Sequence, residues 1–127
     1  MKQIVFYVMV LVLSSCSVCK VAKSSPVREI HFGNGGGFTG NVTSYTLKND
    51  GTLWQNEQQL KKIPCDSLSV LFEMAEDMPR KDYVQPGNTY TFIRIITADG
   101  QHYYSWSLGP MPDKRIFELY QKLTRQL

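Results

Sequence analysis

Residues His31–Leu47 read HFGNGGGFTGNVTSYTL, and this stretch decides the fold. Five glycines fall within the eight positions 33–40, and Phe38 is the only large side chain among them. Because glycine reaches positive φ at little cost, such a run permits a tight turn made largely of backbone. Apolar and β-branched residues flank the run, so strands are predicted over 27–32 and 42–48, joined by a bent connection.

The same glycines match the spacing of a nucleotide-binding motif, because Gly35, Gly37 and Gly40 satisfy G-x-G-x-x-G. A dinucleotide site also requires a helix that begins at the third glycine and holds the pyrophosphate at its N-terminus. The next residues, 41–46, are rich in β-branched and aromatic side chains and favour a strand instead. The glycines are therefore interpreted as serving turn geometry, and no cofactor is expected.

Turn signals and periodicity divide the rest of the chain into further strands and two helices. The predicted elements are strands over 52–55, 89–97 and 101–108 and helices over 66–78 and 113–125. Asp66, which follows Pro64 by two positions, is the predicted N-cap of the first helix. The polar segment 56–62 is interpreted as a loop or a continuation of the preceding hairpin, and 80–88 as a long loop.

The resulting order is β-β-β-α-β-β-α, which defines an α+β fold. Short links between neighbouring strands predict an antiparallel sheet of about five strands with both helices packed on one face. Residues 89–97 carry bulky side chains on both faces of the predicted strand, which indicates a position inside the sheet.

The first residues of the chain have the pattern of an export signal. Lys2 precedes ten uncharged apolar residues, 4–13, a run shorter than the span of about 20 residues that crosses a membrane. The sequence LSSC at 13–16 then resembles the bacterial lipobox. This resemblance implies cleavage before Cys16, diacylglycerol on its sulfur and an acylated amino group. The alternative is an ordinary signal peptide cut after Ser17, which leaves a secreted protein.

The predicted organisation is a lipoprotein signal peptide over 1–15, a flexible lipidated tether over 16–26 and one α+β domain over 27–127. Ser17, rather than aspartate, follows the cysteine. In bacteria that sort lipoproteins by this position, the resemblance favours the outer membrane. No acidic run follows Cys16, so we expect a domain that faces the periplasm and is held at the bacterial membrane through this residue.

Net charge and cysteine content bear on nucleic-acid binding, on disulfide formation and on metal binding. Without Lys2 the 14 basic residues become 13, against 11 acidic ones, a net charge of +2 that is too even to predict nucleic-acid binding. Export places Cys19 and Cys65 in an oxidising compartment where they can pair, but their spacing gives no support for a disulfide. The domain has no Cys-x-x-Cys pair and only His31 and His102 as histidines, so no metal site is expected.

Catalytic patterns such as H-E-x-x-H, G-x-S-x-G and paired carboxylates are missing, so we do not expect an enzyme. A binding module is predicted instead, with Gly36, Gly37, Phe38 and Thr39 as candidate partner-binding residues. Flanking glycines can lift Phe38 into an apolar anchor of the kind that dominates interfaces. The alternative is that Phe38 folds back over one end of the core. His102 lies on a predicted aromatic face, where a structural role is the simpler interpretation.

Two resemblances bear on function. The segment FGNGGGFTG at 32–40, followed by a tyrosine-containing strand, resembles small lipoproteins of Bacteroidota. More distantly, GGFTG at 36–40, the mid-chain helix, the late hairpin and the last helix are similar to emfourin-like inhibitors of thermolysin-type metalloproteases. The second resemblance implies an inhibitor or interaction domain.

The functional hypothesis is therefore a lipid-anchored envelope interaction domain without catalysis, whose partner is a protease or an envelope component. One alternative is a structural outer-membrane lipoprotein with no dedicated site. The other is a small-ligand carrier or an enzyme.

Overall fold

The structure is a computed structural model that describes residues 19–85, 87–107 and 113–127. The predicted signal peptide, Cys16, the first part of the predicted tether and the end of the predicted strand at Leu108 lie outside these residues.

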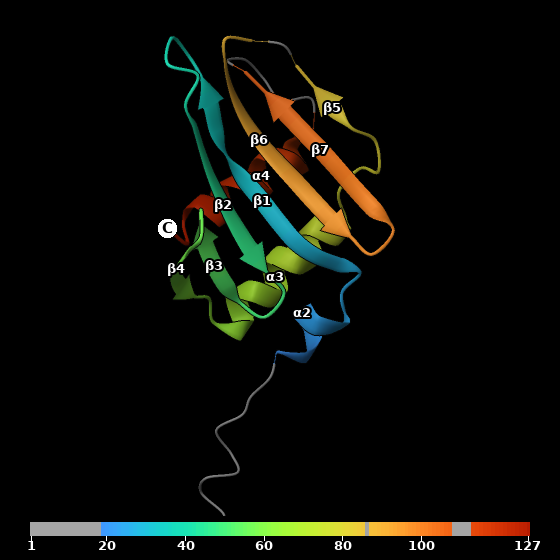
Figure 1. The fold of residues 1–127 in the computed structure, drawn as a ribbon. Coiled ribbons are helices and arrows are strands. Elements are labelled where there is room, and N and C mark those ends of the chain that lie inside the picture. The colour runs from blue at the N-terminus through green and yellow to red at the C-terminus, as the bar shows by residue number, and fades with distance from the viewer. Residues whose placement is uncertain (1–18, 86, 108–112) are drawn as a thin grey trace, which may run out of the picture.

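The described residues form seven strands and three helices, named by the labels of Figure 1. They are α2 (Lys20–Ser24), β1 (Val27–Gly36), β2 (Val42–Lys48), β3 (Thr52–Gln55), β4 (Gln58–Lys62), α3 (Cys65–Glu76), β5 (Tyr83–Val84), β6 (Thr89–Thr97), β7 (Gly100–Trp106) and α4 (Lys114–Thr124). The strands make one sheet in the order β4-β3-β2-β1-β6-β7-β5.

The predicted α+β class is confirmed, but the sheet is larger than expected and is mixed rather than purely antiparallel. Strand β5 runs parallel to β7, whereas the other neighbouring strands are antiparallel. Strand β4 lies in the polar segment interpreted as a loop or a continuation of the hairpin, because its sequence QQLKK has no apolar alternation; all five of its residues are exposed. Strand β5 lies in the predicted long loop over 80–88, because two residues are too few to show a period.

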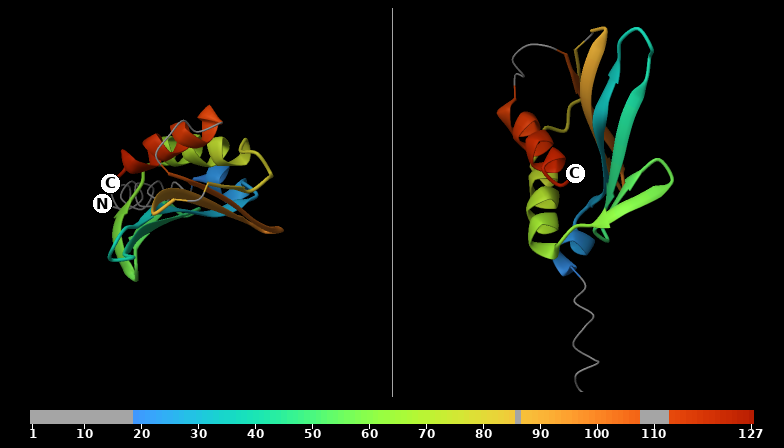
Figure 2. Two further views of the ribbon diagram at one scale, coloured as in Figure 1. Left: turned by 90° about the horizontal axis from the view of Figure 1, so that it is seen from above. Right: turned by 90° about the vertical axis from the view of Figure 1, so that its left-hand side faces the viewer.

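Helices α3 and α4 both cover one face of the curved sheet, as predicted, and the opposite face is open (Figure 2). The core between the layers is apolar. Its largest fully buried side chains are Phe32, Tyr104, Phe72, Ile30, Leu47, Leu53, Leu68, Leu71, Ile93, Ile95, Ile116 and Leu119. Strand β6 pairs with β1 on one side and with β7 on the other, which confirms its predicted interior position.

The folded part begins earlier than the predicted boundary at Val27. Residues 20–24, expected to be flexible tether, form α2, whose Ala22 is fully buried in the core. Cys19 and Cys65 are joined by a disulfide with a Cα–Cα distance of 5.3 Å. The disulfide and the burial of Ala22 hold residues 20–24 in place, although their sequence shows no periodicity. The spacing of residues along the chain predicts neither the disulfide nor this burial.

The two long helices begin differently. The predicted N-cap Asp66 is wrong for α3, because Pro64 occupies the N-cap and Asp66 lies within the first turn. An acidic side chain there is still favourable, because it faces the positive end of the helix dipole. Helix α4 has a side-chain cap at Asp113, whose carboxylate accepts the backbone N–H of Arg115 at 3.0 Å.

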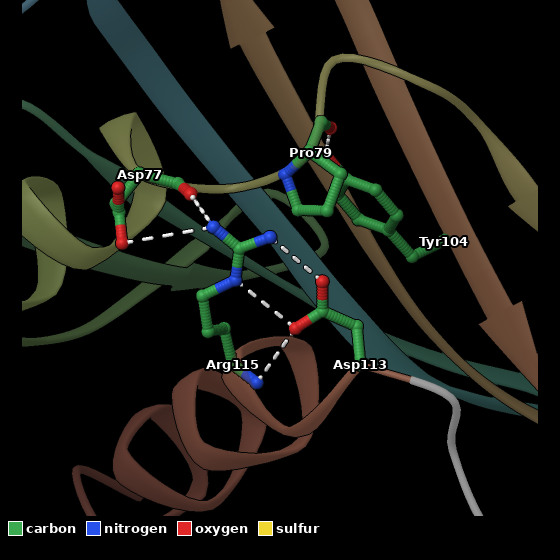
Figure 3. Close-up of polar contacts among 5 residues, drawn as sticks. All are labelled: Asp77, Pro79, Tyr104, Asp113 and Arg115. Atoms are coloured by element: carbon green, nitrogen blue, oxygen red, sulfur yellow. Dashed lines mark hydrogen bonds and ion pairs between the residues drawn. The ribbon is translucent and has the colours of Figure 1, made fainter.

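Polar contacts join the end of α3 to the start of α4 and to β7 (Figure 3). The Arg115 guanidinium donates to the backbone carbonyl of Asp77 at 2.9 Å and to the carboxylate of Asp113 at 2.8 Å. The hydroxyl of the fully buried Tyr104 donates to the backbone carbonyl of Pro79. These contacts give hydrogen-bond partners to the backbone carbonyls of Asp77 and Pro79, which follow α3, and to the Arg115 guanidinium at the start of α4.

Alkaline pH is expected to destabilise the domain through Tyr104. Burial raises the pKa of its hydroxyl to about 12, above the ordinary value of 10.0. The stabilising contribution is therefore complete below about pH 10 and is lost as pH rises toward 12, because only the unfolded state releases the proton in that window. Denaturant unfolding as a function of pH, with Tyr104→Phe alongside, measures the effect. Equal decreases in stability for both proteins across this window would contradict it.

Candidate functional site

The connection between β1 and β2 lies at the end of the sheet opposite α2 (Figure 1). We call residues Gly36–Gly40 the Phe38 loop. Strand β1 extends through Gly36 rather than ending at Phe32 as predicted, and β2 begins at Val42. No helix follows the glycines, so the interpretation of the motif as turn geometry is confirmed.

Backbone hydrogen bonds hold the base of the Phe38 loop. Gly37 N–H donates to the carbonyl of Asn88 at 2.7 Å, and Gly40 N–H donates to the carbonyl of Gly37 at 3.2 Å. Gly36 pairs with Thr89 at the end of the β1–β6 ladder. Main-chain contacts with the segment that precedes β6 therefore hold the base of the loop.

Gly36 explains why this base needs glycine. Its φ is +94°, and a Cβ built there would lie 2.0 Å from the carbonyl oxygen of Asn88. A similar close approach occurs inside β1 at Gly33, where a Cβ would lie 1.9 Å from the carbonyl oxygen of Thr43. The glycine-rich sequence thus lets backbone segments meet more closely than side chains permit.

Gly36→Ala is expected to lower the free energy of unfolding by about 3 kcal/mol, because it adds a backbone clash to a strained φ. Gly40→Ala is the matched control: its φ is +64°, but nothing lies within 4 Å of the added Cβ. We expect that control to cost only about 1 kcal/mol. Urea unfolding measures the free energy of unfolding of both variants. Equal losses would contradict the expectation, because they would show that the backbone moves to avoid the clash with Asn88.

Phe38 points away from the protein. Its relative exposure is 113%, the highest among the large apolar side chains in the described ranges. The alternative in which Phe38 covers one end of the core is therefore wrong. Gly37 and Thr39 beside it are exposed as well. The structure thus combines a fixed backbone base with an unpacked aromatic side chain.

A cleft of about 330 Å³ lies next to the Phe38 loop. Its lining includes Asn34 and Gly36 of β1, Thr89 of β6 and Trp106 of β7. Because Gly36 belongs to both features, a partner that contacts Phe38 can also place a side chain in this cleft. The cleft was not predicted, since it requires the register that brings β1, β6 and β7 together.

The two histidines lie in different surroundings. His31 Nε2 is 2.9 Å from a carboxylate oxygen of Glu29. His102 lines a second cleft, of about 380 Å³, together with Glu76 and Asp99. No hydrogen bond connects His102 to either carboxylate within the ranges that the structure covers. Those ranges also contain no group of three or more His, Cys, Asp or Glu residues that could hold a metal ion.

The open face of the sheet carries an aromatic cluster that was not among the predicted site residues. The ring centroids of Tyr90 and Phe92 are 6.2 Å apart, and those of Phe92 and Tyr103 are 6.1 Å apart. The Arg94 guanidinium lies 5.1 Å from the centre of the Tyr103 ring. Phe92 is only 7% exposed. Tyr90, Arg94 and Tyr103 are half-buried, so Phe38 is more exposed than any side chain of this cluster.

Comparisons with known proteins do not assign the chain: no family model and no curated protein sequence matches it. In the part of the chain that the structure describes, no helix is both long enough and apolar enough to cross a membrane.

Proposed function

We propose that this protein is a lipid-anchored interaction domain of the bacterial envelope that binds a protein partner through the Phe38 loop and performs no catalysis. Residues Gly36, Gly37, Phe38 and Thr39 form the contact. Acylated Cys16 attaches the domain to the periplasmic face of the outer membrane.

The observation that carries this proposal is the complete exposure of Phe38 on a backbone-clamped loop. Aromatic side chains that enter a partner's pocket supply much of the free energy of many interfaces. A loop that is already ordered loses little conformational entropy when it binds. The neighbouring cleft with Trp106 adds a recess beside this projecting side chain.

The resemblance to emfourin-like inhibitors supports a thermolysin-type metalloprotease as the partner. The mature acylated protein, purified in detergent, is expected to inhibit such a protease, and Phe38→Ala is expected to abolish most of this inhibition. An absence of inhibition by the unmodified protein removes the protease as partner. In that case the expected partner at the same loop is an envelope protein.

The anchor is tested separately from the loop. Intact-mass analysis of the membrane-extracted protein is expected to show a chain that begins at Cys16, with a diacylglyceryl group and an additional acyl chain. Multiple acyl chains are needed for stable attachment, because one chain gives only reversible membrane binding. An unmodified thiol, or a chain that begins after Ser17, would contradict the anchor.

The cleft lined by His102, Glu76 and Asp99 favours a small-ligand carrier or an enzyme as a second candidate function. If the Phe38 loop binds the partner, His102→Ala is expected to leave partner binding unchanged, because the His102 cleft shares no residue with the loop or with the cleft beside it. A loss of partner binding or of envelope function in His102→Ala, with Phe38→Ala silent, would favour the second candidate. If both variants are silent while loss of the whole protein weakens the envelope, a structural lipoprotein is favoured.

A further inference from the structure

We infer that the domain stands on the bilayer with its disulfide end against the lipid surface and presents the Phe38 loop on the opposite, aqueous side. We call the region around Cys19, Cys65 and the β2–β3 turn at 49–51 the disulfide end. The inference rests on the proposed acylation of Cys16. It deepens the proposed function, because it determines which class of partner Phe38 can reach.

Only a short length of chain separates the proposed acylation site from the folded domain. Cys19 is three residues after Cys16, and three residues span at most about 10 Å. Cys19 is bonded to Cys65, the first residue of α3, and Ala22 is fully buried. The folded domain therefore starts within about 10 Å of the acylated residue, and no long flexible tether allows it to turn over.

The β2–β3 turn and the start of α3 form the surface beside this attachment. The β2–β3 turn packs on the start of α3, since a Cβ at Gly51 would lie 3.4 Å from Leu68 Cδ2. The amide of Ile63, just before α3, donates to the carbonyl of Gly51 at 2.7 Å. Exposed Asp50 and Asp66 belong to this end and offset nearby lysines such as Lys62. Because acidic and basic side chains both lie at this end, charge does not determine which face of the domain is turned toward the membrane. The short covalent link from Cys16 to Cys19 determines it instead.

The Phe38 loop lies at the opposite end of the sheet from α2 (Figure 1). Strand β1 begins at Val27, directly after α2, and runs ten residues to Gly36 at the base of the Phe38 loop. At about 3.3 Å per residue this strand spans about 30 Å. Figure 1 shows α2 and the Phe38 loop at opposite ends of the sheet. In this pose Phe38 meets a protein surface that stands in the aqueous space, and it does not enter the lipid.

Energy transfer from the protein to the membrane tests this pose. The intact acylated protein is placed in phosphatidylethanolamine–phosphatidylglycerol vesicles that contain an acceptor-labelled lipid. A donor dye is attached through a noncanonical amino acid at position 38 or at position 50, both of which are exposed. We expect transfer from position 38 to be at least about twofold weaker, because of the separation of about 30 Å along β1.

Equal transfer from both positions on vesicle-bound protein would overturn the inference in favour of a domain that lies flat or tumbles. Stronger transfer from position 38 would overturn it in favour of insertion of Phe38 into lipid. Protein that does not float with the vesicles at all contradicts the acylated anchor itself, so the two failures are distinguishable.

A linker variant tests whether the short link sets the pose. A flexible insertion of about 20 residues between Ser17 and Val18, outside the described domain, lets the domain move by tens of ångströms. We expect this variant to stay vesicle-bound while the difference between positions 38 and 50 disappears. A persistent difference would contradict the role assigned to the link from Cys16 to Cys19.

Discussion

Phe38→Ala is expected to weaken partner binding by about 30-fold or more, the effect of losing an interface anchor worth about 2 kcal/mol. The stability of the free domain is expected to stay unchanged, because a side chain that is 113% exposed makes no packing contact that folding depends on. This separation matters, because a loss of binding cannot then be attributed to unfolding. The loop itself stays ordered through the Gly37 and Asn88 backbone contact.

The matched control is Phe117→Ala. Phe117 lies on α4 with 44% relative exposure, so the same change is made to a solvent-facing phenylalanine outside the loop. Affinity is measured as an inhibition constant against a thermolysin-type protease, or as a Kd for whichever protein is captured at the loop. Equal effects of the two substitutions would show that binding depends on general surface apolarity and does not require the loop.

Removal of the disulfide by Cys19→Ser together with Cys65→Ser is expected to lower the free energy of unfolding by about 2–4 kcal/mol. The bond joins residues 46 positions apart, so it restricts a long stretch of the unfolded chain. It also holds α2 against α3, which keeps Ala22 in the core. The expected loss of stability therefore comes from the lost cross-link and from weaker packing of Ala22.

Urea unfolding of the acylated protein in detergent measures this loss, with the unmodified protein under reducing conditions as the second arm. The two arms are expected to agree, because reduction and substitution remove the same bond. Identical unfolding midpoints with and without the disulfide would show that α2 and the core hold this end without the cross-link.

The parts of the fold that the sequence predicts are those with strong local periodicity. The bounds of β2, β3 and β6 match the predicted ranges, because turns with Asn, Asp or Gly flank runs of β-branched and aromatic side chains. The apolar stripes of α3 and α4 likewise predict their packing on one face of the sheet, because residues on one side of a helix recur at a fixed interval. The α+β class follows from these elements.

The rest depends on contacts between distant residues. The pairing of Cys19 with Cys65 requires knowing where α3 begins in space, and α2 has no pattern of its own. The direction of Phe38 could not be predicted either. Glycines on both sides permit an inward and an outward position, and the hydrogen bond from Gly37 N–H to the carbonyl of Asn88 that holds the base of the loop joins residues far apart in the sequence.

Photocrosslinking from position 38 in intact cells tests the central claim most directly. With a photoreactive amino acid in place of Phe38, we predict a crosslink to one discrete protein, whereas the same amino acid in place of Phe117 gives none. Crosslinks from position 38 to lipid alone, or equal labelling of many proteins from both positions, would contradict a partner-binding loop.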